Sequence, residues 1–189
     1  AGRNHALKDG SQIGVGGDAP DVSWRSPAER GSPTVFGSFN SLMKTNDRLL
    51  SLWARLLDRV PDSRLALKAF GLGDDEVRDD LLSRCIAAGI PRERLELLRP
   101  PRGTREHLAS YDVVDIGLDT FPYHGTTTTC EGMLMGLPVV SLAGHTHASR
   151  VGVSLLTAVG LENLIARNED EYIEIAARLA ADPARLAAL

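Results

Sequence analysis

The sequence predicts an α/β fold in which a doubly wound parallel sheet is covered by helices on both faces. From Thr34 onward, short apolar segments alternate with longer segments whose apolar residues recur at helical spacing, which is the pattern of repeated β-α-β units. The short segments are apolar along most of their length, as strands buried on both faces of a parallel sheet are. Polar loops follow four of these strands, and parallel strands bring such loops to one edge of the sheet, where ligands bind. These loops are residues 38–44, 100–107, 120–128 and 143–150.

Composition restricts the class of protein. The 189 residues are 43% apolar and 24% charged with a net charge of −4, which suits one globular domain and lacks the basic character of a nucleic-acid-binding surface. No apolar run is long enough to cross a bilayer, and the N-terminus lacks a signal-peptide pattern, so we expect no membrane partner. Cys85 and Cys130 fit no zinc-binding spacing, which favours a reduced, cytoplasmic protein without a bound metal.

The first 33 residues differ from the rest of the chain. They are rich in Gly, Ser, Pro and charged residues and show neither helical nor strand periodicity, so residues 1–33 are expected to be flexible or disordered. Gly14, Gly16 and Gly17 superficially resemble a dinucleotide-binding turn, but no apolar strand precedes them and Pro20 interrupts the helix that should follow. The sequence therefore predicts one folded lobe, residues 34–189.

The first half of this lobe contains three predicted strands and two predicted helices. Apolar residues at helical spacing run from Asp47 to Val60, and Pro61 ends that helix. A second helix begins with acidic residues after Gly73 and ends before Gly89, as the helix dipole and a left-handed cap favour. The three strands are residues 34–40, 63–70 and 95–98.

The second half continues the alternation. A brief helix over residues 104–111 leads to a central apolar run from Val113 to Leu118, and a second apolar run covers residues 137–142. A helix closed by Gly136 lies between these two strands. The remaining elements are a helix over residues 148–159, a short strand over 164–166, and helices that begin after Asn168 and at Asp182.

The segment between the two central strands offers a binding site for an anion. Gly125 is followed by four threonines, residues 126–129, at a helix start, and a helix N-terminus supplies unpaired N–H donors and partial positive charge. One threonine there would be explained as a helix cap, but a cap uses one hydroxyl and this segment has four. Glu131 follows closely and supplies a carboxylate that could bind a pair of vicinal hydroxyls, such as those of a ribose.

Other polar residues of the loops are candidates on position alone. Lys44 follows the first strand and is one of few lysines, so we favour a contact with phosphate over a merely solvated position. His107 could stack on a nucleobase or cap its helix, and His124 could contact a phosphate or sugar or simply be a loop residue. Asp119 is expected to order its loop by accepting backbone N–H groups. No serine-hydrolase triad order or nucleophile elbow is present.

Several segments together resemble one known family. FGSFNSLMKTN, WARLLDRVPDSRLALKA and the long segment from Arg105 to Leu156 are similar to the carboxy-terminal lobe of the O-linked N-acetylglucosamine transferases, the SPINDLY-type glycosyltransferases of family 41. The resemblance covers about residues 34–189. Its most specific part is the glycine and four threonines of residues 125–129, which we call the threonine turn, together with the SLAG…SR segment that follows. It implies that the chain is one Rossmann-like lobe of a GT-B glycosyltransferase, the lobe that binds UDP.

The resemblance gives roles to residues already noted. Lys44 would contact the diphosphate and neutralise the leaving UDP, which makes it the catalytic candidate. Glu131 stands where the family often has an Asp that holds the ribose hydroxyls, and His107 would lie against the uracil. The full predicted nucleotide-sugar-binding set is Lys44, His107, His124, Gly125, Thr126, Thr127, Thr128 and Glu131.

The chain departs from the family's pattern at four positions near the base and sugar. Members have Gln, Lys, Arg and, in animals, His where this sequence has Ser41, Thr104, Ser110 and Thr126. The resemblance is therefore more informative about phosphate recognition than about recognition of the base and the sugar.

The resemblance also implies the chemistry and the partners. We expect an inverting, metal-independent and cofactor-free transfer of N-acetylglucosamine from UDP-GlcNAc to Ser or Thr hydroxyls of an acceptor protein, with the leaving-group charge met electrostatically. The family's other lobe and its TPR repeats are not among these residues, so the chain alone is expected to be inactive. Two alternatives stay open: a lobe of another GT-B glycosyltransferase, with a glucose donor or an Asn acceptor, and a non-catalytic nucleotide-binding module.

Overall fold

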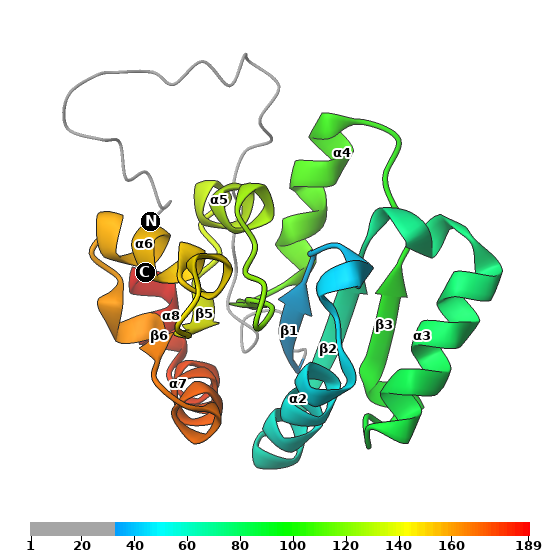
Figure 1. The fold of residues 1–189 in the computed structure, drawn as a ribbon, viewed down its shortest axis with the longest axis horizontal. Helices are drawn as coiled ribbons and strands as arrows, with labels where there is room; N and C mark the ends of the chain where they lie inside the picture. The colour runs from blue at the N-terminus through cyan, green and yellow to red at the C-terminus, as the bar shows by residue number, and fades with distance from the viewer. Residues whose placement is uncertain (1–32) are drawn as a thin grey trace.

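The predicted α/β fold is confirmed by the structure, a computed structural model that describes residues 33–189. Six strands form one sheet (Figure 1), and each pair of neighbouring strands is parallel. The predicted flexible segment, residues 1–33, lies outside the described residues except for Pro33, and it stays a prediction. The strands are β1 (Thr34–Ser38), β2 (Ser63–Lys68), β3 (Leu95–Leu98), β4 (Ile116–Leu118), β5 (Val139–Leu142) and β6 (Ile165–Ala166).

The order of the strands identifies where a ligand would bind. It is β3-β2-β1-β4-β5-β6, so the chain builds the sheet outward in one direction from β1 and then restarts at β4 in the other. In doubly wound sheets of this kind the loops that leave the two central strands diverge and open a crevice at their carboxyl ends. The loops after β1 and β4 therefore form the expected ligand edge.

Helices cover both faces of the sheet. Trp53 of α2 (Asp47–Arg59) and Tyr172 of α7 (Glu169–Ala181) are completely buried on one face, and the Trp53 indole nitrogen lies 3.4 Å from the Tyr172 hydroxyl oxygen. On the opposite face, Leu108 of α4 and Met135 beside α5 pack with Phe39, Tyr111 and residues of the sheet. The helices are α2 (Asp47–Arg59), α3 (Asp75–Ala87), α4 (Thr104–Ala109), α5 (Thr127–Leu134), α6 (Val151–Ala158), α7 (Glu169–Ala181) and α8 (Pro183–Ala188).

Local sequence signals account for most helix ends. Asn46 and Asn168 accept hydrogen bonds from the third residue of α2 and α7, as N-cap side chains do. Gly89 and Gly136, predicted as helix terminators, adopt left-handed φ angles of 98° and 73°, a conformation that glycine reaches without steric cost. These caps and terminators confirm that the helix boundaries are largely encoded locally.

Several element boundaries differ from the sequence prediction, including the following three. The helix expected from Ala148 begins only at Val151, because Thr146 caps a separate 3₁₀ turn, His147–Ser149. Val113 lies in another 3₁₀ turn rather than in the central strand, which starts at Ile116. Phe70 was expected at the end of a strand, but β2 ends at Lys68 and Phe70 is 92% exposed.

Within residues 33–189, no helix is long and apolar enough to span a bilayer.

Candidate functional site

The polar loops meet at the carboxyl edge of the sheet, as predicted. In Figure 1 the arrowheads of β1 and β3 point towards the end of the sheet at which α4 and α5 lie. The loop after β1 carries Lys44, the loop after β3 leads into α4, and the loop after β4 leads into α5. Residues from these loops touch one another across the crevice between β1 and β4.

The threonine turn forms the N-terminus of α5. Thr126 is the N-cap residue, yet its side chain makes no capping hydrogen bond, so the hydroxyl is not used in the way that a simple cap would require. Thr126 and Thr127 are exposed, whereas the Thr128 hydroxyl donates to Asn40 Oδ1 at 2.8 Å. The first N–H groups of any helix lack carbonyl partners within it and attract an anion. The turn therefore presents donors to the solvent side of the crevice.

Gly125 is required by close packing around this turn. A Cβ atom at position 125 would lie 2.5 Å from Thr129 Oγ1 and 2.7 Å from Asn40 Oδ1, closer than real Cβ contacts. The Gly125 N–H donates to Asp119 Oδ1 at 2.7 Å, so this N–H group is satisfied within the protein. Gly125 thus shapes the turn, and the N–H groups left available for an anion are those of the following threonines.

Asp119 orders the loop before α5, as the sequence predicted. Its Oδ1 atom accepts the N–H groups of Thr120, at 2.9 Å, and Gly125, and its Oδ2 atom accepts the Ser141 hydroxyl at 2.7 Å. Complete burial raises the pKa of the Asp119 carboxyl, and these three hydrogen bonds oppose that effect. The carboxyl is thus fully engaged in holding the loop.

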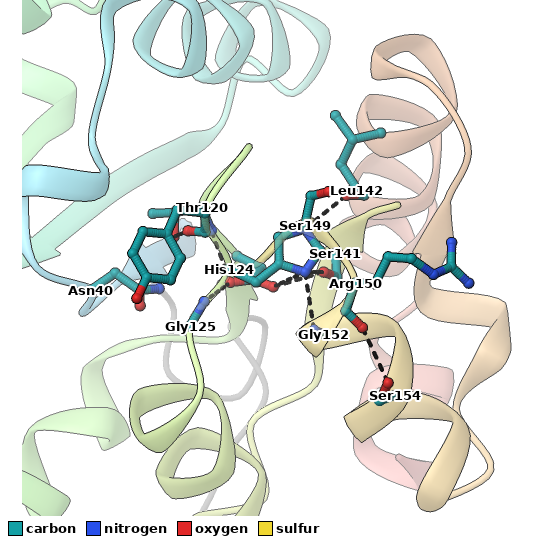
Figure 2. Close-up of polar contacts among 12 residues, drawn as sticks. Asn40, Thr120, His124, Gly125, Ser141, Leu142, Ser149, Arg150, Gly152 and Ser154 are labelled. Carbon is teal, nitrogen blue, oxygen red and sulfur yellow. Dashed lines mark hydrogen bonds and ion pairs between the residues drawn. The ribbon is translucent and has the colours of Figure 1, made fainter. Parts of the chain in front are cut away.

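The His124 side chain points into the protein and not into the crevice, where the sequence analysis expected it. Its ring is fully buried, with Nε2 at 2.9 Å from the Leu142 carbonyl oxygen and Nδ1 accepting the Gly152 N–H at 3.0 Å (Figure 2). Because a carbonyl only accepts and an N–H only donates, the ring is the neutral Nε2–H tautomer. The expected contact of this ring with a phosphate or sugar does not fit the geometry. Only the His124 backbone carbonyl reaches the crevice.

Lys44 is joined to the threonine turn across the crevice. Its Nζ atom donates to the His124 carbonyl oxygen at 2.8 Å and lies 4.3 Å from the centre of the Tyr123 ring. Partial burial lowers the pKa of Lys44, and the charge of Asp119 opposes that change. The ammonium group is therefore held at the start of the segment that leads into α5, where it adds a charged donor to the N–H groups of the helix N-terminus.

His107 and Glu131 are brought together on the other side of α5. His107 Nε2 lies 2.9 Å from Glu131 Oε2, and the hydroxyl of Tyr111 lies 3.4 Å from the same oxygen. Both contacts use Oε2, which leaves Oε1 available for another donor. The predicted roles for His107 against a base and for Glu131 on ribose hydroxyls stay predictions, since these contacts show only that the two side chains form one unit.

A pocket of about 520 Å³ opens beside this unit, within the roughly 300–1,000 Å³ typical of small-molecule sites. The sequence analysis did not select Lys68 or Phe70 from its walls. The available signal for Lys68 was a charged residue directly after the apolar run of residues 65–67. The wall residues are Phe39, Ser41, Lys68, Ala69, Phe70, Pro100, Pro101, Arg102, Gly103, Thr104, His107 and Glu131.

The site contains no ready metal centre in the part of the chain that the structure describes, where no three His, Cys, Asp or Glu side chains gather as metal ligands. What residues 33–189 do bring together is an ammonium group, a helix N-terminus and a pocket with a carboxylate in its wall. These are the groups needed to bind a diphosphate joined to a nucleoside.

Known proteins are similar to this chain in sequence and in architecture. Residues 26–189 match glycosyl transferase family 41. A probable UDP-N-acetylglucosamine–peptide N-acetylglucosaminyltransferase SPINDLY from Solanum lycopersicum is 48% identical over 164 residues, which are 87% of this chain and 18% of that protein. A UDP-N-acetylglucosamine–peptide N-acetylglucosaminyltransferase from Caenorhabditis elegans is 33% identical over 81% of the chain and 13% of its own length.

Solved structures are similar to this chain as well. An O-GlcNAc transferase variant from Thermobaculum terrenum superimposes with a TM-score of 0.80 and 39% identity, covering 90% of this chain and 33% of that one. A sucrose-phosphate synthase from Thermosynechococcus elongatus, 13% identical with a TM-score of 0.60, shares the fold alone. The fold is that of one lobe of GT-B glycosyltransferases, and the chain belongs to glycosyltransferase family 41.

Proposed function

We propose that this chain is the UDP-sugar-binding lobe of a protein O-glycosyltransferase that moves N-acetylglucosamine from UDP-GlcNAc to Ser or Thr hydroxyls. The observation that carries the proposal is the arrangement around α5. Its N-terminus and Lys44 lie on one side, and a nucleoside-sized pocket walled by Glu131 lies on the other. The names of the relatives, which specify UDP-N-acetylglucosamine and a peptide acceptor, support the same donor and acceptor.

The proposed reaction needs charge stabilisation more than acid–base chemistry from this lobe. The acceptor hydroxyl oxygen attacks the anomeric carbon of the sugar, the bond from that carbon to the β-phosphate oxygen breaks, the hydroxyl proton passes to solvent, and UDP leaves with the added negative charge. Lys44 and the N–H groups at the start of α5 would meet that charge, an electrostatic contribution that often dominates catalysis. In this scheme the transfer inverts the anomeric centre and uses neither a metal nor another cofactor.

The remaining partners belong to the proposal as well. The chain spans 18% of the length of the SPINDLY relative from Solanum lycopersicum, so transfer would require the further catalytic region and the TPR repeats expected of the family, together with an acceptor protein. We place this activity in the cytoplasm. A GT-B lobe with a glucose donor or an Asn acceptor, or a non-catalytic nucleotide-binding module, would share the phosphate site and differ in what the pocket selects.

The test is a calorimetric titration of the 189-residue chain with UDP, GDP and ADP. Selective binding of UDP is expected, and Lys44→Met and Thr127→Val should each weaken it by about tenfold to a hundredfold, the usual effect of losing a hydrogen bond to a charged group. Arg59→Met and Thr157→Val are matched controls, because both residues are exposed and lie on α2 and α6, outside the loops that form the site. UDP binding that neither site variant weakens would contradict the assignment of the site, and preference for GDP or ADP would contradict the UDP donor.

A further inference from the structure

Lys68 is a buried cation that the proposed reaction does not use. It is the last residue of β2 and only 3% exposed, and it lies in the wall of the pocket. Its Nζ atom is 3.2 Å from His107 Nδ1 and 3.2 Å from the His107 carbonyl oxygen, and it donates to the Ser110 hydroxyl. Three polar partners therefore converge on one ammonium group at the back of the pocket.

Aromatic rings, and no directly bonded carboxylate, lie against the Lys68 ammonium group. Its Nζ atom lies 4.0 Å from the centre of the Phe39 ring and 5.0 Å from that of Tyr111, within the range of cation–π attraction. Among residues 33–189, Lys68 forms no ion pair with a carboxylate. A buried charge without an ionic partner is costly, so its presence beside the pocket calls for a role there.

The contacts of Lys68 determine the state of the His107 ring. A protonated lysine has donors and no acceptor, so His107 Nδ1 must accept and the ring hydrogen must be on Nε2. The Nε2–H group is then directed at Glu131 Oε2, 2.9 Å away. A chain of two hydrogen bonds thus runs from Lys68 on β2, through His107 on α4, to Glu131 on α5.

We propose that Lys68 is a positioning residue of the nucleotide site: it fixes His107 as the Nε2–H tautomer, and His107 in turn holds the Glu131 carboxylate in place for the vicinal hydroxyls of the ligand's ribose. This inference rests on the proposed function for the ribose contact alone, and the Lys68–His107–Glu131 arrangement itself is independent of it. Ser110 completes the arrangement, because its hydroxyl accepts from Lys68 and donates to the His107 carbonyl at 2.5 Å.

The arrangement has a built-in pH dependence. Burial lowers the pKa of Lys68 to about 8, and the charge of Glu131 opposes this change. The titratable groups that face Lys68 are His107 on α4, Tyr111 after α4 and Glu131 on α5, and burial raises the pKa of Tyr111, which stays protonated in this range. The positive charge on Lys68 is therefore lost as the pH rises through about 8, and UDP binding should weaken over the same range.

The test measures both the tautomer of the His107 ring and the affinity for UDP. Two-bond ¹H–¹⁵N NMR spectra of the ligand-free chain report which ring nitrogen carries the hydrogen, and His107→Gln assigns the signal. We expect the Nε2–H pattern in the wild-type chain and in Lys68→Arg, and a mixture of tautomers in Lys68→Met. The UDP affinity should fall about tenfold in Lys68→Met and recover in Lys68→Arg. Lys44→Met, which removes the other lysine of the site, should leave the tautomer unchanged.

An unchanged His107 tautomer in folded Lys68→Met, or an Nδ1–H pattern in the wild-type chain, would overturn the proposal. If Lys68→Met does not fold, the wild-type spectra between pH 7 and about 9.5 decide: the His107 nitrogen shifts should change with a midpoint near the Lys68 pKa of about 8, and no change there refutes the role. A chain that shows the expected tautomers but binds no UDP would contradict the proposed function and leave the control of His107 by Lys68 intact.

Discussion

Replacing Lys68 with methionine should stabilise the fold at pH 7, because the native residue is a buried charge. Burial lowers the pKa of Lys68 from 10.5 to about 8, and one pKa unit corresponds to about 1.4 kcal/mol. The protonated form therefore costs the folded state about 3 kcal/mol at neutral pH. Methionine keeps most of the aliphatic packing but leaves the Ser110 hydroxyl oxygen and His107 Nδ1 without the donor that Lys68 supplies, at about 1 kcal/mol each. The expected net gain is about 1 kcal/mol at pH 7.

The difference in unfolding free energy between Lys68→Met and the wild-type chain should change sign with pH. Because the pKa of Lys68 is lower in the folded chain, the unfolded chain binds more protons between about pH 8 and pH 10.5, and the wild-type protein gains stability as the pH rises through that window. The Met variant lacks this contribution. Its advantage should be full below pH 8, fall through zero within the window and become a deficit above it.

Urea denaturation of both chains at a series of pH values gives the free energy of unfolding by linear extrapolation. Lys68→Arg is the control, since its charge persists throughout the window. A difference between wild type and Lys68→Met that does not vary with pH would refute the assignment of a charged, buried Lys68. A Met variant that is strongly destabilised at pH 7 would show instead that the ammonium contacts dominate.

Three further predictions follow from contacts at the site. Gly125→Ala should lower the free energy of unfolding by about 1–3 kcal/mol and weaken UDP binding, because the added Cβ would lie 2.5 Å from a threonine hydroxyl. The control in urea denaturation is Gly103→Ala, since nothing lies within 4 Å of a Cβ at that position. Equal losses of stability in the two variants would contradict the packing argument. His124→Leu should lower the unfolding free energy by about 2–4 kcal/mol, because two buried backbone partners lose their hydrogen bonds; a variant of unchanged stability that merely binds UDP more weakly would show that the ring serves the ligand. A thiol reagent at pH 8 should label Cys130, which is exposed, and spare Cys85, which is buried and whose pKa is raised to about 11; UDP should slow the labelling, and equal labelling of both thiols would contradict the structure.

Signals that act within a few residues were readable from the sequence. The apolar strands, the Asn46 and Asn168 caps and the glycine terminators at Gly89 and Gly136 depend on local backbone geometry. The convergence of the polar loops was equally predictable, because parallel strands put their carboxyl ends at one edge. Asp119 was assigned its loop-ordering role correctly for the same reason: its partners, Thr120 and Gly125, are close in sequence.

Contacts between distant segments were not readable in the same way. The His124 ring is enclosed by the Leu142 carbonyl and the Gly152 N–H, which reach it only when β5 and α6 fold over the loop, so a histidine beside a binding turn looked like a ligand residue. Lys68 resembled an ordinary strand residue because its partners, on α4 and in the turn after it, lie about forty residues away in the chain. Whether a polar side chain is buried is decided here by distant segments that fold over it, and its place in the sequence does not reveal this.

A crystal structure of the chain with UDP would show whether this edge of the sheet is the donor site. We expect the diphosphate at the N-terminus of α5 within hydrogen-bond distance of the Lys44 ammonium, the ribose hydroxyls at Glu131, and the base in the pocket between His107 and the loop after β3. UDP bound away from the crevice between β1 and β4, or with its diphosphate remote from α5, would contradict the assignment of this edge as the donor site.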